Sequence, residues 1–223
     1  MSIKLFFNAI IKILLGFLII ALLLFLPANT LNYWNAWLLL GLLFIPMFLG
    51  GIIMMIKSPD LLKKRLKSKE NEKEQKLVIL FSSLMFISGF IIAGFDYRYS
   101  LTTLPHSVVI IASVIFIFGY VLYAEVIREN KYLSRTIEIQ ENQKVIDTGL
   151  YGIVRHPMYS ATILLFFSIP LILSSFLSFI IFITYPFIIA KRIKNEEEFL
   201  EKNLTGYSEY KKKVKYKLIP FIW

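Results

Sequence analysis

The chain has 223 residues, of which 57% are hydrophobic and 18% are charged, and its formal net charge is +10. A soluble domain of this length is less apolar, so the composition predicts an all-α integral membrane protein. The absence of cysteine excludes disulfides, thiolate catalysis and Cys-based zinc sites. With two histidines in the chain, we predict no metal site.

Apolar segments follow one another along the chain. We expect about six hydrophobic helices, at 5–26, 34–56, 77–95, 108–123, 158–174 and 176–189. The first four can cross a hydrocarbon layer of about 30 Å, although the fourth is short. Because only Ser174 and Ser175 separate the last two, we expect a tight helical hairpin.

We predict a single domain, 1–223, with four spans in 1–123 and a cofactor-binding loop, the hairpin and a cytoplasmic C-terminal segment in 124–223.

The basic residues are unevenly distributed among the loops. If both termini are cytoplasmic, all 25 Lys and Arg residues except Arg98 fall on the cytoplasmic side. We therefore expect a multi-pass protein with both termini in the cytoplasm, in the inner membrane if the source is prokaryotic. The basic excess then faces anionic lipid, so we predict membrane lipids as partners and no nucleic acid.

The polar loop 57–76 follows the second apolar segment. Its start predicts a short amphipathic helix, because Pro at the first helical position is favourable. We expect this helix to lie on the membrane surface with Leu61, Leu62 and Leu66 turned to the bilayer.

The stretch 147–161, DTGLYGIVRHPMYSA, joins a polar loop directly to the fifth apolar segment. Pro157 suits the first helical position because its missing N–H would have no partner there, so His156 lies where the cap belongs. Arg155 is then expected at the water edge of the membrane, beside a helix start that attracts anionic groups. An interfacial anchor, with Arg155, His156 and Tyr159 at the headgroup level, explains the pattern equally well.

The segment after the sixth apolar stretch contains a second cluster of polar side chains, in RIKNEEEFL and YSEYKKKV. Its helical spacing predicts that the sixth helix continues out of the membrane. Glu196 and Glu197 then lie on neighbouring faces, unless Arg192 and Glu196 simply form a surface pair at i, i+4. Tyr207 and Tyr210 can likewise be interfacial anchors. We expect the closing LIPFIW to fold back onto the protein or the membrane.

Taken together, GLYGIVRHPMYSA, RIKNEEEFL, YSEYKKKV and LIPFIW resemble the isoprenylcysteine carboxyl methyltransferase family and its relatives among the phospholipid methyltransferases. The likeness is specific over 147–223 and loose upstream, and the turn 204–206 is one residue shorter than the family pattern. It implies a membrane enzyme that uses S-adenosylmethionine. By resemblance, the cofactor site contains Arg155, His156, Pro157, Tyr159, Glu196, Glu197, Tyr207 and Tyr210.

These residue types suit the groups of S-adenosylmethionine. Aromatic rings, from Tyr151, Tyr159 and either Tyr207 or Tyr210, can face the sulfonium or the adenine. Arg155 and the helix start can hold the carboxylate, and the paired glutamates can take the ammonium group or the ribose. We therefore add Tyr151 to the predicted cofactor-binding residues.

The acceptor decides which residues act in catalysis. A carboxylate needs no general base, and Arg155 or Arg192 can position it. An amine or a thiol must lose a proton, for which His156, Glu196 or Glu197 is a candidate. We predict Arg155, Arg192 and Glu196 as the catalytic residues and a lipophilic carboxylate of the prenylcysteine type as the acceptor. A phospholipid amine and a small thiol stay open, and we infer no obligate protein partner.

Two other classes share features of this sequence. Membrane sterol and steroid reductases, which use NADPH, end in a similar Arg-His-Pro loop and a V-x-Y-x-x-I-P tail, although their chains are usually longer. A membrane protein that retains the fold but has lost the site is the other alternative. Binding of S-adenosylhomocysteine rather than NADPH distinguishes a methyltransferase from a reductase.

Overall fold

The computed structural model describes residues 3–66, 73–134, 136 and 138–223, and all regular structure in these ranges is helical. Five segments in this part of the chain are long and apolar enough to cross a membrane, and Pro157–Ile172 is a shorter apolar helix. The predicted all-α architecture with about six hydrophobic helices is thus confirmed. The elements are α1 Ile3–Ala28, α2 Trp34–Lys57, α3 Pro59–Arg65, α4 Lys73–Tyr99, α5 His106–Glu129, η1 Gly149–Gly152, α6 Pro157–Ile172, α7 Phe176–Phe182, α8 Tyr185–Asn203 and α9 Tyr207–Lys213.

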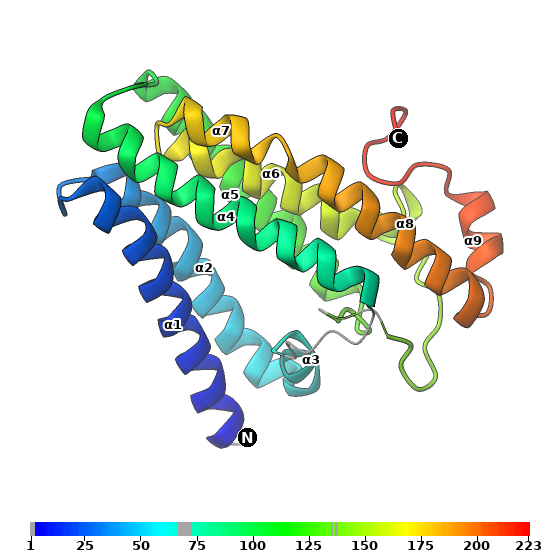
Figure 1. Cartoon of the computed structure of the whole chain (residues 1–223). Coiled ribbons are helices and arrows are strands. Elements are labelled where there is room, and N and C mark those ends of the chain that lie inside the picture. Colours follow the sequence, from blue (N-terminus) through cyan, green and yellow to red (C-terminus); the bar gives the residue numbers. More distant parts are fainter. Residues whose placement is uncertain (1–2, 67–72, 135, 137) are drawn as a thin grey trace.

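The long helices run up and down and pack side by side (Figure 1). The closest packing joins α5 to α6, while α4 contacts α1, α7 and α8. Gly119 allows the approach of α5 to α6, because a Cβ there would lie 3.0 Å from Cγ of Leu165. Phe116 and Phe182 are fully buried in the core between these helices.

The predicted hairpin is present, with one change in its second arm. The chain turns between α6 and α7 at Ser174, whose φ is 56°, and Ser175 caps α7 by accepting from the Ser178 amide at 3.1 Å. The second arm then breaks after α7 and restarts as α8, with Pro186 in its first turn. Proline has no N–H and its ring clashes with the carbonyl four residues earlier, which explains the break. As predicted, α8 continues through the charged segment to Asn203.

The prediction for α3 was wrong in one respect. Leu61 and Leu62 are buried, 8% and 4% exposed, inside the protein rather than turned to the bilayer. Leu61 packs with Leu133 and Tyr151 of the segment that follows α5. The apolar face of α3 is therefore covered by a distant part of the chain that the local sequence pattern does not reveal.

One end of the bundle, called here the Asp96 end, is tied together around a buried carboxylate. Oδ1 of Asp96 accepts from the Thr102 amide at 2.7 Å, and Oδ2 accepts from the hydroxyls of Thr102 and Ser175, each at 2.5 Å. The hydroxyl of Tyr33 donates to the carbonyl of Leu173 at 2.6 Å. These bonds connect the α4–α5 connection and the start of α2 to the hairpin turn.

The opposite end, called here the Arg155 end, gathers α3, the segment 130–156, the end of α8, α9 and the C-terminal tail (Figure 1). Lys12 of α1 donates to the carbonyl of Leu66 at 2.5 Å, and Lys64 donates to Gln140 at 2.5 Å. The loops that carry the basic residues thus meet at one end, as the charge distribution requires. Which side of the membrane this end faces stays a prediction.

Candidate active site

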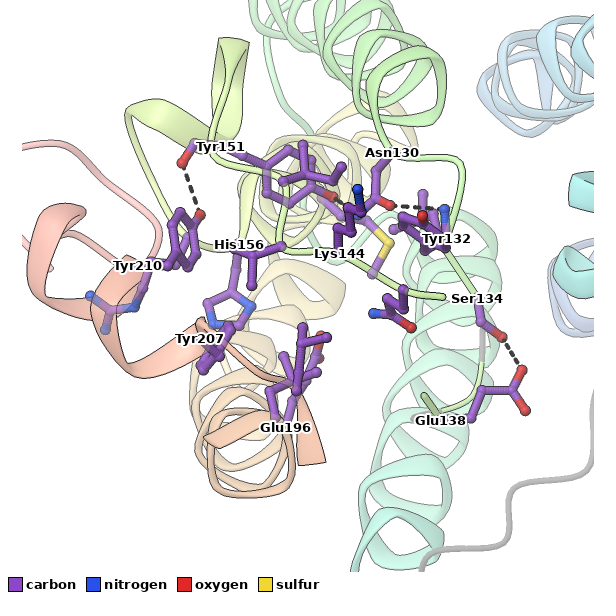
Figure 2. A pocket seen from close by; sticks show the side chains of 18 of the residues that line it. Asn130, Tyr132, Ser134, Glu138, Lys144, Tyr151, His156, Glu196, Tyr207 and Tyr210 are labelled. Carbon is purple, nitrogen blue, oxygen red and sulfur yellow. Dashed lines mark hydrogen bonds between the residues drawn. The ribbon is translucent and has the colours of Figure 1, made fainter. Parts of the chain in front are cut away.

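A cavity opens at the Arg155 end between the segment 130–146, the loop leading into α6, and the α8–α9 region (Figure 2). It contains about 880 Å³ of space not filled by atoms, part of which is open to solvent. The lining includes these predicted site residues: Tyr151, Arg155, His156, Tyr159, Arg192, Glu196, Tyr207 and Tyr210.

The TGLYG stretch is fixed to the end of α5 by Glu129. The carboxylate of Glu129 accepts from the Thr148 hydroxyl at 2.8 Å and from the Leu150 amide at 3.2 Å. Gly149 has φ of 49°, and a Cβ on it would lie 2.3 Å from the Glu129 carboxylate oxygens. The positive φ favours glycine, and a side chain there would also displace the Glu129 carboxylate from its bonds to this stretch. The short 3₁₀ helix that results places Tyr151 against the cavity.

The C-terminal tail pairs with the loop before α6. The amides of Arg155 and His156 donate to the carbonyls of Tyr216 and Lys217, each at 2.9 Å. Leu218 is 4% exposed and packs into the core. The start of the closing LIPFIW thus folds back onto the protein, while Phe221 and Ile222 stay exposed, at 86% and 76%. His156 is also the N-cap of α6, as predicted, although its side chain makes no capping bond.

Arg155 is buried, with 6% of its surface exposed, and not at the water edge as the sequence suggested. Its Nε donates to Oε1 of Glu197 at 2.7 Å, and its Nη1 donates to the carbonyls of Val214 and Lys215 at 2.7 and 2.8 Å. Since α8 and the tail both cover it, the expectation of an exposed Arg155 was wrong. Its Nη2 has no partner in the described part of the chain and is the donor that remains for a ligand.

Glu197 contacts two residues that line the cavity, Arg155 and His156. It is 4% exposed and does not line the cavity, so the predicted direct contact with a cofactor is not supported by its position. Its Oε1 also lies 3.1 Å from Nε2 of His156, and its Oε2 lies 3.8 Å from Nζ of Lys211. Glu197 therefore holds the side chains of Arg155 and His156 in place. Pro157 likewise starts α6 without lining the cavity.

The predicted catalytic pair Arg192 and Glu196 meets at one tyrosine hydroxyl. Tyr159 donates to Oε2 of Glu196 at 2.5 Å and accepts from Nε of Arg192 at 2.8 Å. Adjacent residues on a helix point about 100° apart, which explains why Glu196 lines the cavity while Glu197 faces away from it. The arrangement joins a cation, a hydroxyl and a carboxylate on the cavity wall.

Tyr207 has a buried hydroxyl on the wall of the cavity. Its side chain lines the cavity and is 4% exposed, yet its hydroxyl has no hydrogen-bond partner among the described residues. Burial raises the pKa of this hydroxyl well above its usual value, and the Glu197 and Glu196 carboxylates raise it further. The group therefore stays protonated. A buried donor without a partner is costly, so a polar ligand atom is expected to bond to it.

Tyr210 differs from Tyr207 in this respect. Its hydroxyl donates to the carbonyl of Tyr151 at 2.8 Å, a bond visible in Figure 2. The hydroxyl of Tyr151 in turn accepts from the side-chain amide of Asn130 at 2.9 Å. These two tyrosines thus present their rings to the cavity while their hydroxyls hold the loop together.

One wall of the cavity was missed by the sequence analysis. It comes from the segment after α5, including Asn130, Tyr132, Ser134, Glu138 and Lys144 (Figure 2). The Ser134 hydroxyl donates to Glu138 at 3.0 Å. In the sequence this segment looks like a solvated loop with balanced charges, and no periodicity or motif marks it. Only folding against α6 and α8 makes it part of the site.

Comparison with known proteins supports a related family. Residues 107–206 match the family model described as phospholipid methyltransferase. The matched range includes Tyr151, Arg155, Tyr159 and Glu196, and it ends directly before Tyr207. The comparison with curated proteins gave no significant match. The chain is thus similar, over the part that builds most of the cavity, to the family described as phospholipid methyltransferase.

Proposed function

We propose that the protein transfers the methyl group of S-adenosylmethionine to a lipophilic acceptor at the membrane interface. The observation that carries this proposal is the buried Tyr207 hydroxyl, which no described residue bonds, in a tyrosine-lined cavity. Most of the residues that line this cavity lie in the range similar to phospholipid methyltransferases. When bound, S-adenosylmethionine supplies an electrophilic methyl group on a sulfonium cation.

The described residues fit such a ligand. The rings of Tyr151, Tyr207 and Tyr210 offer π faces to the sulfonium or to the adenine. Nη2 of Arg155 offers a charged donor to the carboxylate. Glu196 offers an acceptor to the ammonium group. Aromatic, basic and acidic side chains are thus available on different parts of one cavity.

For an acceptor carboxylate of the prenylcysteine type, the protein has to orient the nucleophile and need not remove a proton. Arg192 is the candidate for this task, because it lines the cavity beside Tyr159 and Glu196. Nε of Arg192 is aligned by the Tyr159 hydroxyl on the cavity wall. Arg155 then acts on the cofactor side, and Arg192 on the acceptor side.

A phospholipid amine is the second candidate, and the match to the phospholipid methyltransferase model favours it. An amine acceptor must lose a proton during the transfer. Glu196 is the candidate base, since its carboxylate lines the cavity and its Oε2 already accepts a proton donor, Tyr159. Because Glu196 is also assigned to the ammonium group of the cofactor, the two acceptors are distinguished by the product that forms and not by the loss at Glu196.

Binding measurements test the proposal. We expect purified protein to bind S-adenosylhomocysteine by calorimetry and to ignore NADPH. Binding of NADPH without S-adenosylhomocysteine would instead assign the cavity to a reductase. Incubation of lipid extracts with methyl-labelled S-adenosylmethionine, followed by separation of the labelled lipids, then identifies whether an ester or a methylated amine is formed.

The orientation in the membrane is part of the proposal. We place both termini and the Arg155 end in the cytoplasm, because this puts all Lys and Arg residues except Arg98 on the cytoplasmic side. A reporter that functions only in the cytoplasm, fused after Trp223, should be active. A reporter active only outside the membrane would reverse the topology.

A further inference from the structure

A second, mainly apolar groove lies on the Arg155 end, between the end of α2, the short helix α3 and the end of α5. Gly50, Ile53 and Met54 of α2 and Ile127 of α5 provide its apolar surface. A Cβ built on Gly50 would meet no atom within 4 Å, so this part of the groove is open. The groove lies where two membrane-length helices end, which is the depth at which lipid chains meet their headgroups.

Basic side chains surround the polar end of this groove. Lys57, at the end of α2, and Lys131, just after α5, both line it and are exposed. The ammonium group of Lys131 lies 5.1 Å from the ring centre of Tyr132. Within the described ranges neither lysine is paired with a carboxylate. Two uncompensated cations thus stand at the headgroup level beside an apolar surface.

The other charges around the groove do not cancel this excess. Nη2 of Arg128 lies 2.5 Å from Oε1 of Glu125, and Nζ of Lys64 donates to the neutral side chain of Gln140. Asp60 is the acidic residue in the groove lining. The lining therefore carries four basic groups and one acidic group.

We propose that this groove binds an anionic phospholipid, with the phosphate between Lys57 and Lys131 and an acyl chain along Gly50, Ile53 and Met54. Charge complementarity and the position at the ends of two spans favour this occupant over a protein segment. The binding does not depend on methyl transfer. Tyr132 also lines the candidate active-site cavity, so the two spaces share a wall.

Native mass spectrometry of the purified protein tests the headgroup contact. We compare phosphatidylglycerol with phosphatidylcholine of the same acyl chains and expect preferential retention of phosphatidylglycerol. The double variant Lys57→Gln/Lys131→Gln should lower phosphatidylglycerol occupancy by about tenfold while leaving phosphatidylcholine unchanged. The control Lys194→Gln/Lys202→Gln removes the same charge from exposed positions on α8 and should behave as wild type.

A second pair of variants tests the acyl-chain surface. Gly50→Leu should fill the open groove and lower retention of phosphatidylglycerol, whereas Gly41→Leu, on the same helix but outside the groove, should not. Equal retention of both lipids by wild type would overturn the proposal. Unchanged retention of phosphatidylglycerol by Gly50→Leu would also overturn the proposal. This measurement tests the groove even if the double lysine variant fails to fold. Addition of labelled S-adenosylmethionine then shows whether the retained lipid is itself methylated, which separates this site from the proposed function.

Discussion

The two ends of the bundle each contain a buried carboxylate, and the two carboxylates are satisfied in different ways. Asp96 is 1% exposed and accepts from neutral donors, the Thr102 amide and the hydroxyls of Thr102 and Ser175. Glu197 is 4% exposed and accepts from the charged Arg155, with His156 on the same oxygen. The carboxylate at one end is therefore surrounded by neutral hydrogen-bond donors, whereas the carboxylate at the other end forms an ion pair.

The surroundings of the two carboxylates explain the difference. The donors around Asp96 come from the α4–α5 connection and the hairpin turn, and their bonds join these elements directly. Glu197 lies behind a cavity, where it holds the side chains of Arg155 and His156 that line that cavity. Next to it, Tyr207 has a buried hydroxyl without a partner in the described residues. The bonds around Asp96 connect parts of the fold, whereas the Tyr207 hydroxyl can accept a partner from outside the described chain, either a ligand or a water.

The largest expected effect is that of Arg155→Ala. The substitution leaves Glu197 buried with a weaker set of partners and frees the carbonyls of Val214 and Lys215. Removal of one partner of a buried ion pair lowers the free energy of unfolding by about 3–5 kcal/mol. We therefore expect a clear loss of thermal stability in detergent. A melting temperature equal to that of wild type would show that the ion pair does not hold this end together.

Asp96→Ala should have the next largest effect on stability. It removes the acceptor from the hydroxyls of Thr102 and Ser175 and from one amide, at a cost of about 1–3 kcal/mol for an unsatisfied buried group. Methyl transfer per folded molecule should stay at the wild-type level, because Asp96 lies at the end opposite the cavity. Lost activity in protein of normal stability would contradict the division between the two ends.

The glutamate series separates the roles along α8. Glu196→Gln should lower methyl transfer about tenfold, a barrier change of about 1.4 kcal/mol, with little change in stability. Glu197→Gln should lower both activity and stability, because it weakens the bond to Arg155. Glu198 forms an exposed pair with Lys194 at 3.9 Å, so Glu198→Gln should change stability by less than about 0.5 kcal/mol. Equal small effects at all three positions would remove α8 from the proposed site.

A matched tyrosine pair gives the smallest but most specific test. Tyr207→Phe removes a hydroxyl that has no described partner, so stability should not fall, while affinity for S-adenosylhomocysteine should fall by about fivefold, or 1 kcal/mol. Tyr210→Phe removes a bond to the carbonyl of Tyr151 and should instead lower stability by about 1 kcal/mol. Calorimetry and thermal melting on both variants distinguish these outcomes. Unchanged affinity in Tyr207→Phe would leave its hydroxyl without a role in binding.

The amino-acid sequence by itself determined the helical membrane architecture, the hairpin that turns at Ser174 and Ser175, and the start of α6 at Pro157. These features depend on hydrophobic length and on backbone chemistry, which are local properties. The sequence also pointed to Tyr159 and Glu196, which the structure brings into contact at 2.5 Å. Both lie in segments that the resemblance covers, and their roles stay a prediction.

Only the tertiary structure decided how the polar residues divide between support and binding. Arg155 is buried because Glu197, 42 positions later in the chain, and the carbonyl of Val214 meet it there. The wall formed after α5 and the unpartnered hydroxyl of Tyr207 likewise depend on segments distant in sequence. Burial and hydrogen bonding are properties of what surrounds a side chain. Spacing along the chain predicts them only where the surrounding residues are neighbours in sequence.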